Sequence, residues 1–381
     1  MHQPIVQELA DHIHDEGWVA AFDKAVETAK KKAPGAMIRI PDLNHFYDFM
    51  DNLQTWVPFE DCDGTYVYLQ LCTFYFVFDQ ESVIGLQTPI RPGNEELSWL
   101  SDWLVRYAKA MGEFLDTPES LTPITLKTFW ATKKYRMDDY LEPAEGWKNF
   151  NEFFARKLKP GRPIGEHIIS PADSTYEGQW KLDENSCITV NESSVTVKGI
   201  TWKISELLQD SVYAKRFANG TFIHSFLGPN DYHRMHAPVA GKVLETKLIK
   251  GQVYLEVTAG KDGKLQPIRK IERSDGEAPE AHDSVGYQFC QMRGLVVLET
   301  EVGLVAILPI GMAQVSSVKL TVEKDQILEK GDEIAYFQFG GSDIVMLFET
   351  TKSSHVEITA NPGTHYDMGQ TIAIGILDCS T

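Results

Sequence analysis

A few side chains of this sequence have the types and settings that catalysis uses, and they lie far apart along the chain. They occur in ISPADSTYEG, in FLGPNDYHRMHAP and in an apolar strand pattern interrupted by Gly-Gly-Ser, and they are Asp173, His233, His236, Gly340, Gly341 and Ser342. An acid, a histidine and a serine can form a nucleophilic triad, here in the chain order Asp173, His236, Ser342. Whether the three side chains meet is a question for the structure.

The two histidines form a His-x-x-His pair, which could also bind a metal ion. A metal site would need a third ligand at a suitable spacing, and we identify none nearby, so we expect no metal. Pro229, Asp231 and Pro238 make the surrounding segment irregular and polar. Loops of this kind often hold functional groups on a rigid scaffold.

The Gly340-Gly341 pair sits where a strand is expected. Glycines in a strand usually mark a bulge, a bend or a close approach of the backbone, so a simple β-bulge is one interpretation. The GxSxG motif of lipase-type hydrolases is absent, because Ile344 stands where its last glycine would be. This sequence therefore gives little support to an esterase.

Charge and composition limit the possible partners. The 381 residues include 36 Lys+Arg and 54 Asp+Glu, for a formal net charge of −18. Nucleic acids and anionic membrane surfaces attract clustered cations, so we expect neither a nucleic-acid partner nor stable membrane insertion. The longest apolar run, Tyr66 to Phe78, is shorter than the ~20 residues of a membrane-spanning helix.

The cysteines and the N-terminus indicate a cytoplasmic protein. The start of the chain is polar and acidic, unlike a signal or transit peptide. The cysteines are odd in number, widely spaced and without a CxxC pair, so we expect free thiols in a reducing compartment. They are Cys62, Cys72, Cys187, Cys290 and Cys379.

The elements that must position these groups fall into two parts. Helical periodicity marks residues 6–32, 43–53 and 97–115, and a Pro-containing stretch at 116–123 marks a boundary. A second helical stretch follows and ends in NFNEFFARKLKPGRPI, and beyond Ser170 short β-branched runs alternate with turns, including ITVNESSVTVKG. We predict an α+β protein with a helical N-terminal domain (residues 1–120) and a β-rich catalytic domain (residues 121–381).

Four motifs, in this order, together resemble one known family. FFARKLKPGRPI, SPADS, DYHRMHAPVAG and KGDEIAYFQFGGSDIVMLF are similar to the successive motifs of the phosphatidylserine decarboxylase family, from about Phe153 to Phe348. The combination is far more specific than any of the motifs alone. The resemblance implies a decarboxylase that processes itself and depends on a pyruvoyl group.

The resemblance also implies a role for each candidate residue. Ser342 would attack the carbonyl of Gly341, with His236 as base and Asp173 as the acid that orients it. The chain would separate into residues 1–341 and 342–381, which stay associated, and Ser342 would become a covalent pyruvoyl group. A substrate amine forms a Schiff base with such a group, which accepts electrons as CO2 leaves, and His233 would protonate the product carbon.

The sequence departs from the family's usual LGST at the cleavage site, where it reads Gly-Gly-Ser-Asp. A Gly-Gly-Ser version with a helical N-terminal extension is similar to a soluble branch that decarboxylates free amino acids such as tryptophan. We therefore expect a free L-amino acid substrate, aromatic ones favoured, with phosphatidylserine as the alternative and a non-enzymatic binding module as a third possibility. The basic run from Arg156 to Arg162 could contact lipid phosphates, but we interpret it as a solvated surface stretch. The family also suggests a possible homo-oligomer.

Overall fold

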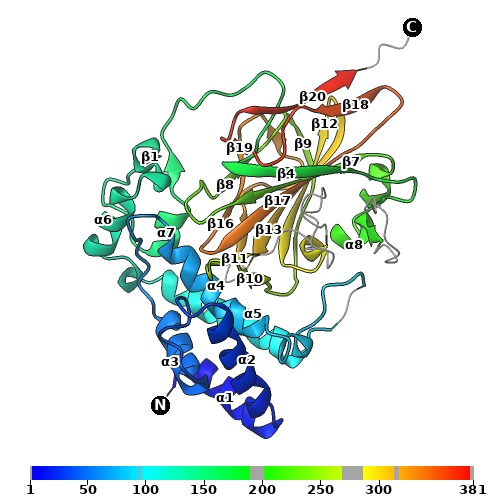
Figure 1. Cartoon of the computed structure of the whole chain (residues 1–381). Helices are drawn as coiled ribbons and strands as arrows, with labels where there is room; N and C mark the ends of the chain where they lie inside the picture. Colours follow the sequence, from blue (N-terminus) through cyan, green and yellow to red (C-terminus); the bar gives the residue numbers. More distant parts are fainter. Residues whose placement is uncertain (1, 94–95, 189–200, 268–285, 313–316, 378–381) are drawn as a thin grey trace.

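The computed structural model describes residues 2–93, 96–188, 201–267, 286–312 and 317–377. It has a helical N-terminal part followed by a β-rich part, which confirms the α+β prediction (Figure 1). Of the cysteines, the four that lie in described residues form no disulfide, and Cys379 falls outside the described residues. The expected strand run ITVNESSVTVKG lies almost wholly outside the described residues as well. No described helix is both long enough and apolar enough to cross a membrane.

The N-terminal part is built from five α-helices. Their bounds are α1 (Pro4–Asp15), α2 (Val19–Lys32), α3 (Leu43–Gln54), α4 (Tyr66–Phe78) and α5 (Trp99–Leu115). The predicted helix over 6–32 is two helices, because Gly17 adopts a φ of +70° between them, a conformation that glycine tolerates best. The apolar run 66–78 is the buried helix α4, as its composition predicts. Asp42 and Ser98 cap α3 and α5 with their side chains.

The β-rich part centres on one eight-stranded antiparallel sheet. Two helices, α6 (Pro123–Ala131) and α7 (Phe150–Phe154), connect it to the N-terminal part (Figure 1). The strand order is β15 (Ile327–Leu328), β9 (Gly241–Ile249), β12 (Arg293–Thr300), β13 (Gly303–Met312), β17 (Gly341–Phe348), β7 (Thr221–Leu227), β4 (Ser174–Lys181) and β19 (His365–Tyr366). Strand β17 is thus an interior strand, paired on one side with β13 and on the other with β7.

Both faces of this sheet are buried, and alternation along β17 assigns its side chains to one face or the other. Ile344 and Met346 belong to the large core shared with the N-terminal helices. Val345 and Leu347 belong to a second core, which includes side chains of the short helix α8 (Ile204–Leu207). Successive residues of β17 therefore face two different apolar environments. The division into domains 1–120 and 121–381 stays a prediction.

Smaller sheets complete the fold. Two are three-stranded, namely β14 (Val318–Leu320), β16 (Glu333–Phe337) and β8 (Arg234–His236), and β18 (Ser354–Ile358), β20 (Thr371–Leu377) and β3 (Ile168–Ile169). Three are two-stranded, namely β1 (Tyr140–Leu141) with β2 (Lys157–Leu158), β5 (Cys187–Ile188) with β6 (Trp202–Lys203), and β10 (Val257–Ala259) with β11 (Leu265–Pro267). The sheet of β14, β16 and β8 carries the His-x-x-His segment to the end of the main sheet where β17 begins.

Candidate active site

Ser342 is the second residue of β17, and it lies between two neighbouring strands. Its register partners are Gly311 of β13 and Leu227 of β7. The residue is fully buried, with no solvent-exposed surface. A serine in this setting has its backbone fixed on both sides, so its hydroxyl is presented to one defined partner.

The backbone just before Ser342 is held in an unusual conformation. Gly340 has a φ of +144°, a backbone conformation that residues other than glycine rarely adopt. The preceding Phe339 donates its backbone N–H to Oδ1 of Asn151, in α7, at 2.9 Å. Gly340, for which a bulge and a bend are both possible from the sequence, thus lies in a bend that turns the chain into β17. The buried side chain of Asn151, in the helical part, holds the residue before it.

The described hydrogen-bond partner of the Ser342 hydroxyl is His233. The Nδ1 atom of His233 lies 3.2 Å from Oγ of Ser342, and its Nε2 atom lies 3.4 Å from the carbonyl oxygen of Pro229. A carbonyl oxygen only accepts hydrogen bonds, so Nε2 carries the proton and Nδ1 is free to accept the Ser342 hydroxyl. Phe154 stacks on the imidazole with ring centroids 3.8 Å apart.

The environment of His233 keeps its imidazole neutral. Burial, and to a smaller extent the positive charge of Arg156, lower its pKa to about 3. An uncharged imidazole with a free lone pair is the form that a general base needs.

Arg156 organises the loop that carries His233. It is 1% exposed, and its Nη2 atom donates to the carbonyl oxygens of Asn230 and Asp231 at 2.9 and 3.2 Å. Its guanidinium lies 4.1 Å from the ring centroid of Tyr140. The run from Arg156 to Arg162 is therefore not a solvated surface stretch throughout, since its first arginine is buried and its last one pairs with Asp173. The sequence does not reveal that Arg156 is buried, because one buried arginine followed by exposed lysines has the same composition as a basic run on the surface.

His236 lies close by but does not bond to Ser342. Its Nδ1 atom lies 2.7 Å from the carbonyl oxygen of Gly331, and its Nε2 atom lies 2.8 Å from the hydroxyl of Tyr232. Both ring nitrogens therefore have partners. The expected pairing of His236 with Ser342 is absent from the described hydrogen bonds, and His233 takes that position instead.

Asp173 belongs to a separate buried network. Its Oδ1 atom pairs with Arg162 and accepts the backbone N–H of Met368 at 2.7 Å. Burial raises the pKa of this carboxyl, although the charge of Arg162 opposes the shift. The Arg162 guanidinium lies 5.9 Å from the ring of Tyr232, the partner of His236. Asp173 and His236 thus lie in one connected region, and Ser342 and His233 form the neighbouring pair.

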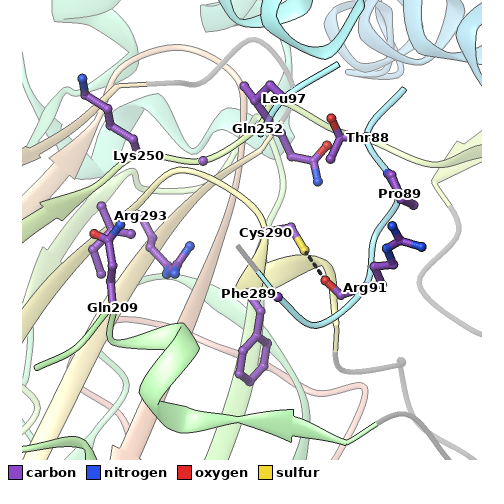
Figure 2. Close-up of a pocket in the computed structure, with 13 residues that line it drawn as sticks. Thr88, Pro89, Arg91, Leu97, Gln209, Lys250, Gln252, Phe289, Cys290 and Arg293 are labelled. Carbon is purple, nitrogen blue, oxygen red and sulfur yellow. Dashed lines mark hydrogen bonds between the residues drawn. The ribbon is translucent and has the colours of Figure 1, made fainter. Parts of the chain in front are cut away.

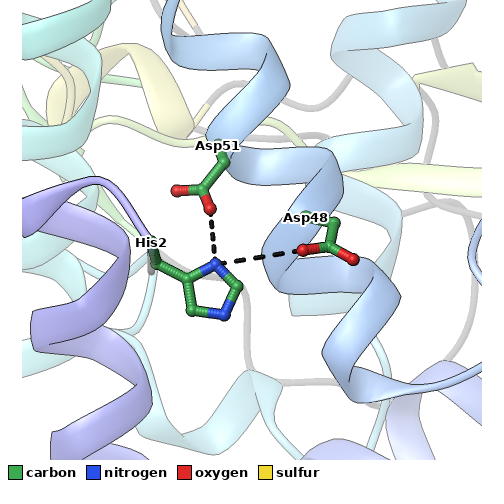
Figure 3. A group of neighbouring side chains, drawn as sticks. All are labelled: His2, Asp48 and Asp51. Carbon is green, nitrogen blue, oxygen red and sulfur yellow. Dashed lines mark hydrogen bonds and ion pairs between the residues drawn. The ribbon is translucent and has the colours of Figure 1, made fainter.

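Two other groups of side chains lie outside this site. A cavity of about 250 Å³ is lined by Arg91, Lys250, Cys290 and Arg293, among others (Figure 2). Near the N-terminus, His2 bonds to Asp51 and lies 4.0 Å from Asp48 (Figure 3). This is the one group of three potential metal ligands among the described residues, and it is partly exposed. Neither group includes Ser342 or its partners.

Comparison of the sequence with known proteins identifies a family. The family profile described as Phosphatidylserine decarboxylase matches residues 150–374. The chain belongs to the phosphatidylserine decarboxylase family. Its matched region begins at α7, and it includes Asp173, both histidines and the Gly-Gly-Ser turn.

Individual relatives agree with this assignment. The chain is 34% identical to phosphatidylserine decarboxylase proenzyme 3 of Schizosaccharomyces pombe over 64% of this chain, but only 23% of that longer protein is covered. It is 31% identical to a phosphatidylserine decarboxylase proenzyme of Ruminiclostridium cellulolyticum, with 64% and 73% of the two chains covered. It is 32% identical to that of Fusobacterium nucleatum, with 67% and 74% covered.

Membership of the phosphatidylserine decarboxylase family makes the protein a carboxy-lyase of a family that uses a covalent pyruvoyl group, and it favours an enzyme over the binding-module alternative. The residues fit such a group. A buried serine follows two glycines, and its hydroxyl bonds to the unprotonated nitrogen of a neutral imidazole. All three relatives carry the name of the lipid enzyme rather than that of an amino-acid decarboxylase.

Proposed function

We propose that this chain cuts itself between Gly341 and Ser342 and then decarboxylates phosphatidylserine to phosphatidylethanolamine. The observation that carries the proposal is the 3.2 Å contact between Nδ1 of His233 and Oγ of Ser342, directly after a glycine turn. The family profile, which covers this contact, supports the reaction class.

The proposed cleavage uses only groups of the chain and one water molecule. His233 accepts the hydroxyl proton of Ser342, and Oγ attacks the carbonyl carbon of Gly341. The C–N bond breaks, which leaves an ester and a free amine at position 342. Loss of the Cα proton then breaks the Cβ–O bond, releasing Gly341 as a carboxylate and leaving dehydroalanine, which water converts to the pyruvoyl group and ammonia.

In the cut enzyme, the residues around position 342 bind, orient and transfer protons. The pyruvoyl group supplies a carbonyl that condenses with the substrate amine and accepts the electrons released with CO2. His233 stays next to this position and is the group that returns a proton to the product carbon. Phe154, stacked on the imidazole, fixes its plane and excludes water from that side.

We assign His236 and Asp173 a structural role around the site, without direct contact with Ser342. His236 bonds to Gly331 and Tyr232, and it thereby ties β8 to the turn before β16. Asp173 holds Arg162 beneath the same tyrosine. A role for His236 as the base of Ser342 would require at least one of its present hydrogen bonds to break, because both ring nitrogens are occupied.

A free amino acid is the second candidate substrate. It is favoured by the Gly-Gly-Ser-Asp turn, the net charge of −18 and the helical part ahead of the matched region. The names of the relatives favour the lipid.

Two measurements test the proposal. Purified protein should separate into two chains on a denaturing gel, and Ser342→Ala should remain a single chain of 43.0 kDa. A single wild-type chain that releases no CO2 would refute the proposal. Release of CO2 should then be compared between phosphatidylserine vesicles and free L-amino acids, aromatic ones included. Activity on free amino acids alone would replace the lipid with the second candidate.

A further inference from the structure

Directly after Ser342, an acidic side chain is buried on the opposite face of the sheet. Asp343 is fully buried and points into the second core, among Val345 and Leu347 of its own strand. Carboxylates are rarely buried without partners, because removing the charge from water is costly. The partners of Asp343 therefore indicate why an acidic residue is buried at this position.

Two side chains from distant segments converge on one oxygen of Asp343. Nε2 of His224, in β7, lies 3.1 Å from Oδ2 of Asp343, and both side chains are fully buried. The hydroxyl of Tyr287, in the short helix η6 (Tyr287–Phe289), donates to the same oxygen at 2.6 Å. The Tyr287 hydroxyl also lies 3.4 Å from Nε2 of His224, so the three groups are mutually in contact.

The segment on the other side of the scissile bond has its own attachments, which come from the helical part. Phe339 donates its N–H to Asn151, and the side chain of Gln338 donates to Oδ1 of Asp116 at 3.0 Å. Asn151 also donates to that carboxylate at 3.0 Å. The two ends that cleavage would create are thus held by different elements.

We propose that Asp343, with His224 and Tyr287, anchors the new chain end and so positions the carbonyl group formed at residue 342. This inference rests on the proposed self-cleavage. Before cleavage, the bond from Gly341 to Ser342 holds this end of β17 in register. After cleavage, the end of the strand is free to fray, as strand and chain termini do. The anchor holds Oδ2 of Asp343, one residue away from the reactive position.

The position of this end matters for turnover. A displacement of ~1 Å between reacting groups can cost about 100-fold in rate. His233 is fixed by Phe154 and by its loop, so the pyruvoyl carbon must be held equally well. Asp343 is in this sense a positioning residue, since its side chain faces away from the substrate side.

The test compares Asp343→Asn in two backgrounds, the self-cleaving chain and the uncut Ser342→Ala chain. Asparagine keeps the size and one acceptor oxygen of aspartate and replaces the other oxygen with an NH2 group, so both proteins should fold. We expect the melting temperature to fall further in the cut protein than in the uncut one. In the cut protein, kcat per mole of phenylhydrazine-reactive carbonyl should fall at least tenfold, with a smaller change in KM. His224→Gln should give the same pattern.

The matched control is Leu347→Val, on the same strand and face but away from the cut. It should lower the melting temperature equally in both backgrounds and leave kcat per carbonyl unchanged. If Asp343→Asn lowered the melting temperature equally in the two backgrounds, the proposed anchor would be overturned. It would also be overturned if the Asp343→Asn chain folded but was not cut, because Asp343 would then act in self-cleavage. A wild-type chain that is not cut would refute the proposed function itself, and the anchor with it.

Discussion

His233 and Ser342 are 109 residues apart in sequence, yet a 3.2 Å hydrogen bond joins the Nδ1 atom of one to Oγ of the other. This contact brings the His-x-x-His loop to the second residue of the interior strand β17. The imidazole is neutral and fully buried, and its other nitrogen is occupied by a carbonyl oxygen. The precursor thus has a base in place for its serine.

The first prediction separates the two histidines. His233→Gln should slow self-cleavage about 100-fold or more, because general-base catalysis typically contributes that much. His236→Gln should be cut within a few-fold of the wild-type rate, since its present bonds only connect β8 to its surroundings. Cleavage is followed over time on denaturing gels. Normal cutting of His233→Gln together with an uncut His236→Gln would mean that His236 leaves Gly331 and Tyr232 to reach Ser342, as the family resemblance implies.

The second prediction concerns acid stability. The pKa of His233 is lowered to about 3 in the folded chain, while an unfolded histidine titrates near 6.5. Between these values the unfolded state binds a proton that the folded state does not, so His233 lowers the free energy of unfolding as the pH falls below 6.5. The expected slope is about 1.4 kcal/mol per pH unit.

This slope is measured by urea unfolding at pH 6, 5 and 4, in the uncut Ser342→Ala background. Adding His233→Gln should remove the contribution, because glutamine does not titrate. Parallel stability curves for the two proteins would show that His233 is protonated in the folded state at these pH values.

The third prediction tests the buried arginine. Arg156→Met should lower the free energy of unfolding by about 2–3 kcal/mol, since hydrogen bonds from a charged group to two loop carbonyls are lost. Cleavage should also slow, because the loop of His233 is no longer held. The neighbouring Lys157 is exposed, so Lys157→Met is the control and should change neither quantity. Equal behaviour of the two variants in thermal melts and on gels would remove Arg156 from the site.

The fourth prediction concerns Gly340, which lies two residues before Ser342. Gly340→Ala should destabilise the precursor by about 1–2 kcal/mol, because its φ of +144° is unfavourable for alanine. The shifted backbone should also slow cleavage at least tenfold. Gly35→Ala, where an added Cβ meets open space, should have little effect on either. A Gly340→Ala chain that is cut at the wild-type rate would show that the conformation of this turn is not required.

The sequence predicted the helices well where apolar periodicity was strong, as in α3 and α5. It missed the break at Gly17, because a short turn can interrupt a helix without interrupting the apolar pattern. The resemblance identified the residues of the site, but their pairing depends on tertiary structure. His233 lies just before β8 and His236 within it, so a spacing of three does not decide which ring reaches Ser342. The buried partners of Asp343 come from β7 and from η6, and no local pattern connects them.

The interior position of β17 has one more consequence. The small chain of the proposed mature enzyme would begin with a strand that is hydrogen-bonded to β13 on one side and to β7 on the other. Cutting between its first two residues, Gly341 and Ser342, would change the covalent connectivity but leave both ladders beyond the cut in place. The cut protein should therefore migrate as a single particle until it is denatured. Cut molecules should also not exchange their small chains, because a separate small chain would have to insert its first strand between β13 and β7. Maturation would therefore be a single, irreversible event in the life of each molecule.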